Sequence, residues 1–458
     1  MLKYAIGAAA IVGILVHPIS GAESRADSGR VVIYIETPLL TGDWVSIVLA
    51  SAELIGEPGR APVLSTPVTL DSAGGQRKLS ESAIAVGRYL TLRIRFSKAV
   101  ALIDGVPVEL ACDSAGASIP LEVTVFSGST QLVILGLTPA KTDGDSPRFL
   151  PRLRLIHRDL PLPGSLVFVS NEGSNYLTVI DRFSFQVVDV IGVGQGPRGM
   201  AYSRSARQLY VANSGDDNLS IIDVMTRQTV RTVPLQFGDQ PSRLALSPDE
   251  QSLYVLCPGS STLVVMQTQS YQESGRYPMG DTPVAMVVDA TTDDVYVSCL
   301  LSDNVMIFDP ADQSVAVAAT VSASPTELAL DGREGILFLA RQHPRALVVV
   351  NAREGNQTAA IDLCAAATGL AYSPTTRQLF AAVADCFEIA VVKPQHEFAL
   401  GSIAMSDKPT LLTLDPEGRW LFAVMPEADR LVVINAVSRK VSAEIDVGHR
   451  PYLALTPE

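Results

Sequence analysis

The sequence has 458 residues, of which 47% are hydrophobic and 18% charged, a composition that is typical of β-rich globular proteins and argues against disorder. This length exceeds what one ordinary hydrophobic core organises, so we expect several domains or a repeat fold. The formal net charge of −13 repels phosphate backbones and argues against nucleic acid as a partner.

The first segment of the chain has the pattern of an export signal. Lys3 precedes an apolar core over residues 5–16, and Pro18 is followed by small residues that favour cleavage. We expect residues 1–22 to be a signal peptide that is removed after Ala22. A retained membrane anchor is the alternative, but a spanning helix needs about 20 apolar residues. We therefore expect a periplasmic or secreted protein with no membrane span after cleavage.

Residues 30–156 contain strand-like runs without a repeat. The runs are residues 30–36, 44–54, 88–96, 106–110, 121–126 and 130–137. In the third run, Leu90, Leu92 and Ile94 alternate with polar residues, as in a strand with one buried face. Six to eight such strands with glycine and proline turns predict a β-sandwich of immunoglobulin-like or transthyretin-like type. The order of the runs, with FLPRLRL near Phe149, resembles a secreted bacterial β-sandwich family of unknown function.

The chain beyond a short, proline-rich linker, residues 157–164, repeats itself. A strand–turn–strand pattern, strands b and c, starts at Val167, Leu209, Leu253, Val295, Leu337, Leu379 and Leu421. These starts are 42 residues apart, and once 44. A short apolar strand a, which ends in a Ser/Asp-Pro or Asp-Gly turn, recurs in phase, and a strand d follows c. This period is typical of one four-stranded β-propeller blade.

The strand count predicts how the propeller closes. Seven copies each of strands a and b are present. The first b strand has no a strand before it, and the last a strand, residues 453–456, has no b strand after it. We therefore expect residues 165–458 to form one seven-bladed propeller, closed one strand plus three, because a closed ring leaves no exposed edges. The predicted fold is all-β: an N-terminal β-sandwich followed by this propeller.

Several b strands resemble the signature of a known repeat family. YVAN at residues 210–213, FVSN at residues 168–171 and LALSPDEQSLYV at residues 244–255 resemble the YVTN family of β-propeller repeats. The resemblance implies an exported binding or scaffold protein. Later copies replace Asn213 by cysteine, arginine, valine or methionine, which weakens any site transferred from the family consensus.

Two sets of polar residues could bind a cation but are better explained by turns. Asp216, Asp217 and Asn218 lie between strands b and c, but calcium needs six or more oxygens, and the equivalent turns lack paired acids. Short acceptors recur at the end of strand c, at Asp181, Asp223, Asp309, Asn351 and Asn435. We expect them to cap the c–d hairpins rather than form a ring of ligands. With no zinc, nucleophile-elbow or phosphate-loop motif, we expect no catalytic residue, metal or cofactor.

Two of the five cysteines are candidates for a disulfide. Cys364 lies in a d–a loop and Cys386 in the b–c turn of the same blade, and both loop types emerge on one face of the ring. An oxidising compartment permits a bond between them, with buried thiols as the alternative. Cys257 and Cys299 occupy equivalent sites in adjacent blades, about 10 Å apart, which is too far for a bond. Cys112 has no obvious partner.

The face that carries the d–a loops holds the candidate binding site. Its residues are Arg198, Asp239, Arg243, Asp281, Glu327, Lys408, His449 and Arg450. We interpret them as a mixed-charge platform at the channel mouth for a protein, peptide or small polar ligand, with a solvated rim as the alternative. The predicted function is an exported, non-enzymatic scaffold with an envelope or periplasmic protein partner or ligand. The alternative is a lactonase-like hydrolase with a cation in the central channel, and DNA binding would require a basic channel face.

Overall fold

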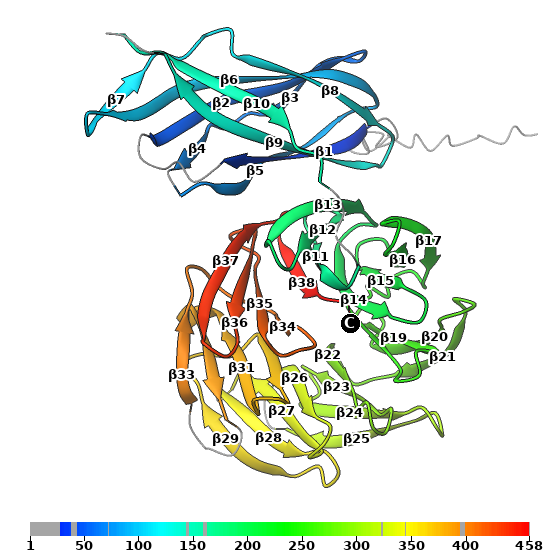
Figure 1. The fold of residues 1–458 in the computed structure, drawn as a ribbon. Coiled ribbons are helices and arrows are strands. Elements are labelled where there is room, and N and C mark those ends of the chain that lie inside the picture. Colours follow the sequence, from blue (N-terminus) through cyan, green and yellow to red (C-terminus); the bar gives the residue numbers. More distant parts are fainter. Residues whose placement is uncertain are drawn as a thin grey trace, which may run out of the picture.

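The computed structural model describes residues 28–37, 44–71, 73–142, 146–158, 163–321, 324–343, 345–393 and 399–457. The expected signal peptide, residues 1–22, lies outside the described residues. In the described part of the chain, no helix is long and apolar enough to cross a membrane. Figure 1 shows two bodies of β-strands, a sandwich and a ring of blades, that lie against each other.

The first body is a sandwich of ten strands. They are β1 (Ser28–Thr37), β2 (Trp44–Gly56), β3 (Gly59–Leu64), β4 (Val68–Asp71), β5 (Gly75–Ala85), β6 (Gly87–Ile103), β7 (Val106–Leu110), β8 (Ala117–Val125), β9 (Thr130–Lys141) and β10 (Phe149–Leu155). One sheet has the order β10-β9-β1-β5, and the other has β3-β2-β6-β7 with β4 on β2 and β8 on β6. Apolar residues of both sheets form one core. The sequence runs missed β3, β4 and β5, which are short or rich in polar residues.

Strand β1 is buried on both faces. Val31, Ile33 and Ile35 point into the sandwich core. The intervening residues Val32 and Tyr34 pack instead against the propeller, and both are at most 1% exposed. Since successive side chains of a strand point to opposite faces, this one strand is shared by two hydrophobic cores.

The second body is a ring of seven four-stranded blades. Blade 1 contains β11 (Leu166–Asn171), β12 (Tyr176–Asp181), β13 (Gln186–Gly192) and β38 (Pro451–Leu455). Blades 2 and 3 are β14 (Pro197–Ser203), β15 (Gln208–Asn213), β16 (Asn218–Asp223), β17 (Gln228–Pro234), and β18 (Arg243–Leu246), β19 (Ser252–Cys257), β20 (Thr262–Gln267), β21 (Glu273–Pro278). Blades 4 and 5 are β22 (Pro283–Val288), β23 (Val295–Cys299), β24 (Asn304–Asp309), β25 (Ser314–Thr320), and β26 (Pro325–Asp331), β27 (Ile336–Arg341), β28 (Ala346–Asn351), β29 (Gln357–Asp362). Blades 6 and 7 are β30 (Gly369–Ser373), β31 (Gln378–Val383), β32 (Glu388–Val392), β33 (Ala399–Ala404), and β34 (Leu412–Leu414), β35 (Trp420–Met425), β36 (Arg430–Asn435), β37 (Lys440–Asp446).

The C-terminal strand closes the ring, as predicted. β38 pairs antiparallel with β11, with Val169 opposite Ala454 and Ser170 opposite Leu453. The Ser170 hydroxyl joins two blades, because it donates to the backbone carbonyl of Arg198 at 2.7 Å and accepts from the backbone N–H of Leu453 at 3.2 Å. Figure 1 shows β38 in red beside the green strands of blade 1. The one-plus-three closure of the seven-bladed propeller is therefore confirmed.

One aromatic residue per blade fills the space between adjacent blades. These residues recur in register on strand b: Phe168, Tyr210, Tyr254, Tyr296, Phe338, Phe380 and Phe422. Each is at most 4% exposed, and each belongs to a core cluster shared with the next blade of the ring. Aromatic side chains bury much apolar surface at little entropic cost, so this repeated position explains why the blades pack as a ring.

A buried polar cluster fixes the sandwich to the propeller. The Glu81 carboxylate accepts hydrogen bonds from the Ser174 hydroxyl at 2.9 Å and the Tyr176 hydroxyl at 3.0 Å. On its own body, Glu81 forms an ion pair with Arg30 at 3.4 Å. Burial is the main factor that raises the pKa of Tyr176 well above its ordinary value. Glu81 is therefore bound by residues of both bodies, and it links the sandwich to the propeller.

We expect Glu81→Ala to loosen this interface by about 2 kcal/mol or more, because two hydrogen bonds to a charged group are lost. Thermal unfolding followed by calorimetry should then change from one transition to two. Glu122→Ala is the matched control, since Glu122 is 68% exposed and its ion pair with Arg88 lies on the sandwich alone. An identical single transition in both variants would contradict the proposed joint.

Candidate binding site at the channel mouth

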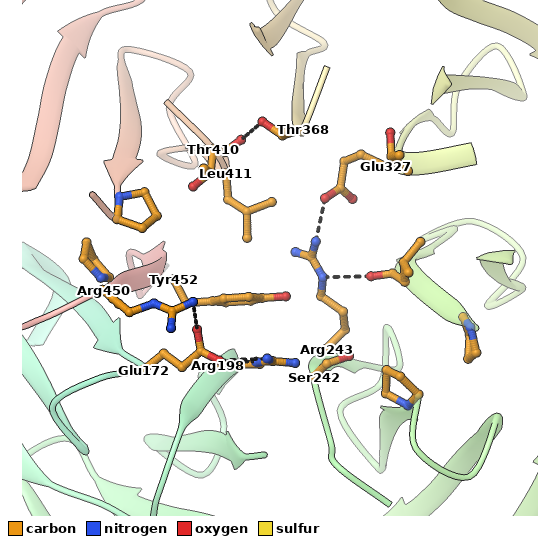
Figure 2. A pocket seen from close by; sticks show the side chains of 16 residues that line it. Glu172, Arg198, Ser242, Arg243, Glu327, Thr368, Thr410, Leu411, Arg450 and Tyr452 are labelled. Atoms are coloured by element: carbon orange, nitrogen blue, oxygen red, sulfur yellow. Dashed lines mark hydrogen bonds and ion pairs between the residues drawn. The ribbon is translucent and has the colours of Figure 1, made fainter. Parts of the chain in front are cut away.

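The second residue of each proline- or alanine-led a segment faces the central channel. These seven residues, one from each blade, form a ring: Arg198, Ser242, Val284, Thr326, Thr368, Thr410 and Tyr452. They line a cavity of about 470 Å³, which Figure 2 shows from close by. Because the repeat places them in register, the composition of this ring decides what the channel mouth can bind.

Half of the ring is apolar toward the cavity. The three threonine hydroxyls donate to backbone carbonyls of the wall: Thr326 to Ala367 at 3.0 Å, Thr368 to Thr410 at 3.1 Å and Thr410 to Val424 at 3.4 Å. Val284, Leu411 and several prolines complete this side, and Figure 2 shows the Leu411 side chain pointing into the cavity. The threonine hydroxyl protons are therefore used inside the wall, and the oxygens can only accept hydrogen bonds from a ligand.

The opposite side is cationic. The Nε and Nη2 atoms of Arg198 both donate to Oε1 of Glu172, at 3.0 and 2.7 Å. Arg450 approaches the other oxygen of Glu172 only to 3.9 Å, and its side chain is 62% exposed. Two guanidinium groups thus share one carboxylate, which leaves a net positive charge at this edge of the cavity.

An ion pair between blades 3 and 5 crosses blade 4 and lines one side of the cavity. The Arg243 guanidinium, from blade 3, donates to Glu327 of blade 5 at 2.5 Å, and their side chains are 16% and 8% exposed. Arg243 also donates to the backbone carbonyl of Val284 at 3.4 Å. The blade 4 residue at the corresponding position of the repeat is the small, buried Ala285. Burial raises the pKa of Glu327, and the nearby Arg243 opposes that rise.

Tyr452 lies between two of these arginines. The guanidinium carbons of Arg198 and Arg243 are 5.5 and 5.6 Å from its ring centre. Cation–π contacts of this kind hold both the ring and the guanidinium groups in place. Its hydroxyl makes no hydrogen bond to any of the described residues, and in Figure 2 it points into the cavity. It therefore remains available as a donor to a ligand.

A second hollow adjoins the first. It has a volume of about 720 Å³ and shares Thr410, Pro426 and Arg450 with the channel-mouth cavity. Lys408 and His449 line it, and each faces an acid: Lys408 Nζ is 3.6 Å from Glu427, and His449 Nδ1 is 3.0 Å from Asp429. Six of the eight residues of the predicted platform, Arg198, Arg243, Glu327, Lys408, His449 and Arg450, therefore line two connected hollows.

The other two predicted platform residues line neither hollow. Asp239 is 1% exposed and forms an ion pair with Arg276 at 2.7 Å. Although burial opposes it, hydrogen bonds from Arg276 and Ser260 lower the pKa of this carboxyl. Asp281 is exposed on its loop, where its backbone N–H donates to the Ser302 hydroxyl at 2.6 Å. Asp239 is thus a structural anchor and Asp281 a residue of the solvated rim.

The acidic turn between strands b and c fastens neighbouring loops. Asp217 accepts from the backbone N–H groups of Gly238 at 2.8 Å and Gln240 at 2.7 Å, and Asp216 accepts from Gln195 at 2.7 Å. Equivalent turns do the same: Gly196 donates to Asn175, Ser324 to Asp303 and Arg450 to Asp429. These side-chain oxygens hold the d–a loops that surround the channel mouth, which is a structural role.

The acceptors at the ends of strands c cap the c–d hairpins. Each accepts from the backbone N–H two residues later: Asp181 from Phe183, Asp223 from Met225, Asp309 from Ala311, Asn351 from Arg353 and Asn435 from Val437. They point to the turns rather than to a shared cation. Among the described residues, no group of three or more His, Cys, Asp or Glu side chains is placed to hold a metal ion.

The cysteines fall into two classes. A disulfide joins Cys364 and Cys386, whose Cα atoms are 6.5 Å apart, and ties a d–a loop to the b–c turn of blade 6. Cys257 and Cys299 are free and fully buried, and burial raises the pKa of both thiols. Cys112 is also free.

Sequence reasoning missed Glu172, Tyr452 and the three threonines of the ring, Thr326, Thr368 and Thr410. The signal was present, because the residue after the proline of each a segment recurs in register with the repeat. Glu172 follows Asn171 at the end of strand b in blade 1, and only the ring closure brings it beside Arg450. The decisive clue would have been to align the seven a segments and compare their second residues.

Residues 190–330 match a family model described as a lactonase with a seven-bladed β-propeller. Among solved structures, the chain is similar to the dihydro-heme d1 dehydrogenase NirN, with 15% identity, a TM-score of 0.52, and coverage of 65% of this chain and 76% of NirN. It is also similar to hydrazine synthase of Kuenenia stuttgartiensis, with 18% identity, a TM-score of 0.52, and coverage of 61% and 97%. At these identities the likeness shows the fold alone. No curated protein matches the sequence.

Proposed function

We propose that this protein is an exported, non-enzymatic β-propeller that binds a protein or a small ligand at its channel mouth, in the bacterial envelope or periplasm. The observation that supports this most directly is the ring of in-register residues, which surrounds a cavity with arginines on one side and apolar groups on the other. The YVTN-like b strands and the export-like N-terminal segment support the same proposal.

The state of the carboxylates favours binding over hydrolysis. Glu172 accepts two hydrogen bonds from Arg198, and Glu327 accepts from Arg243. The oxygens of both carboxylates that face the arginines are therefore already occupied by charge-assisted hydrogen bonds. The cavity therefore presents donors to a ligand rather than a free general base.

The alternative is a propeller hydrolase. The match of residues 190–330 to the lactonase model favours it, and Glu172 and Glu327 are the carboxylates that line the channel. A cation there would need several converging oxygens, so the arginines would first have to release these two groups. We rank this function second for that reason.

The test is crosslinking of the full-length protein in its native envelope, followed by identification of partners. We expect the double variant Arg198→Gln and Arg450→Gln to lose at least nine tenths of the specific crosslinks, because both guanidinium groups that share Glu172 are removed. Arg204→Gln is the matched control, since Arg204 lies in an exposed a–b turn on the opposite face of the ring. Equal crosslinking by all variants would place binding elsewhere, and a stoichiometric cation together with ester turnover would establish the hydrolase instead.

A further inference from the structure

We propose that the ligand of the channel-mouth cavity is an amphipathic monocarboxylate, a molecule with one carboxylate group and an apolar body. This inference rests on the binding function proposed above and specifies the ligand class. It follows from three properties of the cavity: a surplus of positive charge at one edge, an apolar wall opposite, and threonine hydroxyls whose protons are already donated to wall carbonyls.

The carboxylate is expected to bind at the edge formed by Arg198 and Arg450. These two guanidinium groups share the single carboxylate of Glu172, and Arg450 reaches it only at 3.9 Å. Arginine recognises carboxylates through paired, charge-assisted hydrogen bonds. The Tyr452 hydroxyl, which makes no hydrogen bond within the described chain, points into the cavity toward the side of Arg243 and offers a further donor there. Among the residues that line this cavity, three arginines face two glutamates, a surplus of one positive charge; the adjoining hollow, which Arg450 also lines, adds Asp385 and Glu427 against Lys408.

The apolar body is expected to lie between Leu411 and the ring of Tyr452, which face each other across the cavity in Figure 2. The methyl groups of the neighbouring threonines extend this surface, because their hydroxyls donate into the wall. The cavity volume of about 470 Å³ is ordinary for a small-molecule site. Contact with such a wall favours a hydrocarbon or aromatic body over a hydroxylated one.

Other ligand classes fit less well. The guanidinium of Arg243 is neutralised by Glu327 at 2.5 Å, so a dianion would place its second charge against a compensated ion pair. A sugar or sugar acid would need several donors as well as acceptors, yet the threonine hydroxyl protons are already donated to carbonyls of the wall. The geometry therefore distinguishes one carboxylate with an apolar body from polyanions and carbohydrates.

Octanoate is the probe for this proposal, measured by isothermal titration calorimetry on the purified full-length protein. We expect octanoate to bind at least tenfold more tightly than acetate, which lacks the body, and than octan-1-ol, which lacks the charge. Gluconate, an anion with a hydroxylated body, should also bind at least tenfold more weakly. Arg450→Gln should weaken octanoate at least tenfold, and the control Arg204→Gln should leave it unchanged.

Leu411→Ala tests the apolar wall separately. It should weaken octanoate at least fivefold and leave the weak acetate affinity unchanged, a difference that general misfolding would not produce. No octanoate binding, or gluconate binding equal to octanoate, would overturn the ligand class. The two proposals fail separately, because crosslinks that depend on Arg198 and Arg450 would still support binding at the mouth even if octanoate did not bind.

Discussion

Glu327→Ala is expected to lower the free energy of unfolding by about 3–5 kcal/mol. The variant leaves the guanidinium of Arg243 only 16% exposed, without the carboxylate that compensates its charge. An unpaired buried charge is far more costly than the loss of an exposed ion pair, which is worth about 1 kcal/mol or less. Urea denaturation followed by far-UV circular dichroism measures the effect.

The double variant Arg243→Met and Glu327→Leu is the control for this prediction. It removes both charges and keeps similar volume, so it should recover most of the stability lost in Glu327→Ala. Recovery would show that the loss comes from the unpaired cation and not from a void beside Ala285. A loss below about 1 kcal/mol in the single variant would mean that the pair behaves as an exposed one.

Removal of residues 451–458 is expected to be more severe, with a loss of more than about 5 kcal/mol of stability, comparable to the whole stability of many domains. The deletion takes away β38, so β11 keeps β12 but loses its other ladder partner, and the ring acquires an open edge. Size-exclusion chromatography should show aggregates or larger species in place of the single species formed by the intact protein.

A synthetic peptide of residues 449–458 should restore the compact form of the truncated protein, because a partner that binds only the folded state stabilises it by mass action. The same peptide with Ala454→Asp is the control, since Ala454 is 2% exposed at the closure and a charge there is not tolerated. Equal rescue by both peptides would argue against specific pairing with β11. A truncated protein of unchanged stability would show that the closure contributes little.

The repeat made most of the fold predictable. A fixed period with matching strand patterns gave the number of blades, and the strand count gave the closure through β38. The sandwich was predictable from alternating runs such as β6, but β3, β4 and β5 were not, because strand β5 is polar along most of its length and the others are short. The run RVVIYIE at residues 30–36 could have shown that β1 is buried on both faces, since buried strands lack alternation.

The site was predictable only in part. Sequence position in a d–a loop identified Arg198, Arg243 and Arg450, because loops of one type share one face of the ring. The same rule could not distinguish these cavity-lining arginines from Asp239. That residue is buried in an ion pair with Arg276 of strand β21. Pairings such as Arg243 with Glu327, across an intervening blade, depend on the curvature of the ring and on a small residue between them, which no local pattern contains.

The double burial of β1 has a consequence for the order of events during biosynthesis. β1 is the first strand of the described chain to be synthesised. Its propeller-facing residues Val32 and Tyr34 pack on blades 1 and 7. Blade 1 gains its fourth strand only when residues 451–455 have been made. The apolar face of β1 that carries Val32 and Tyr34 therefore stays exposed to solvent until the rest of the ring has been synthesised. The propeller-facing side of β1 can therefore complete its contacts only near the end of synthesis.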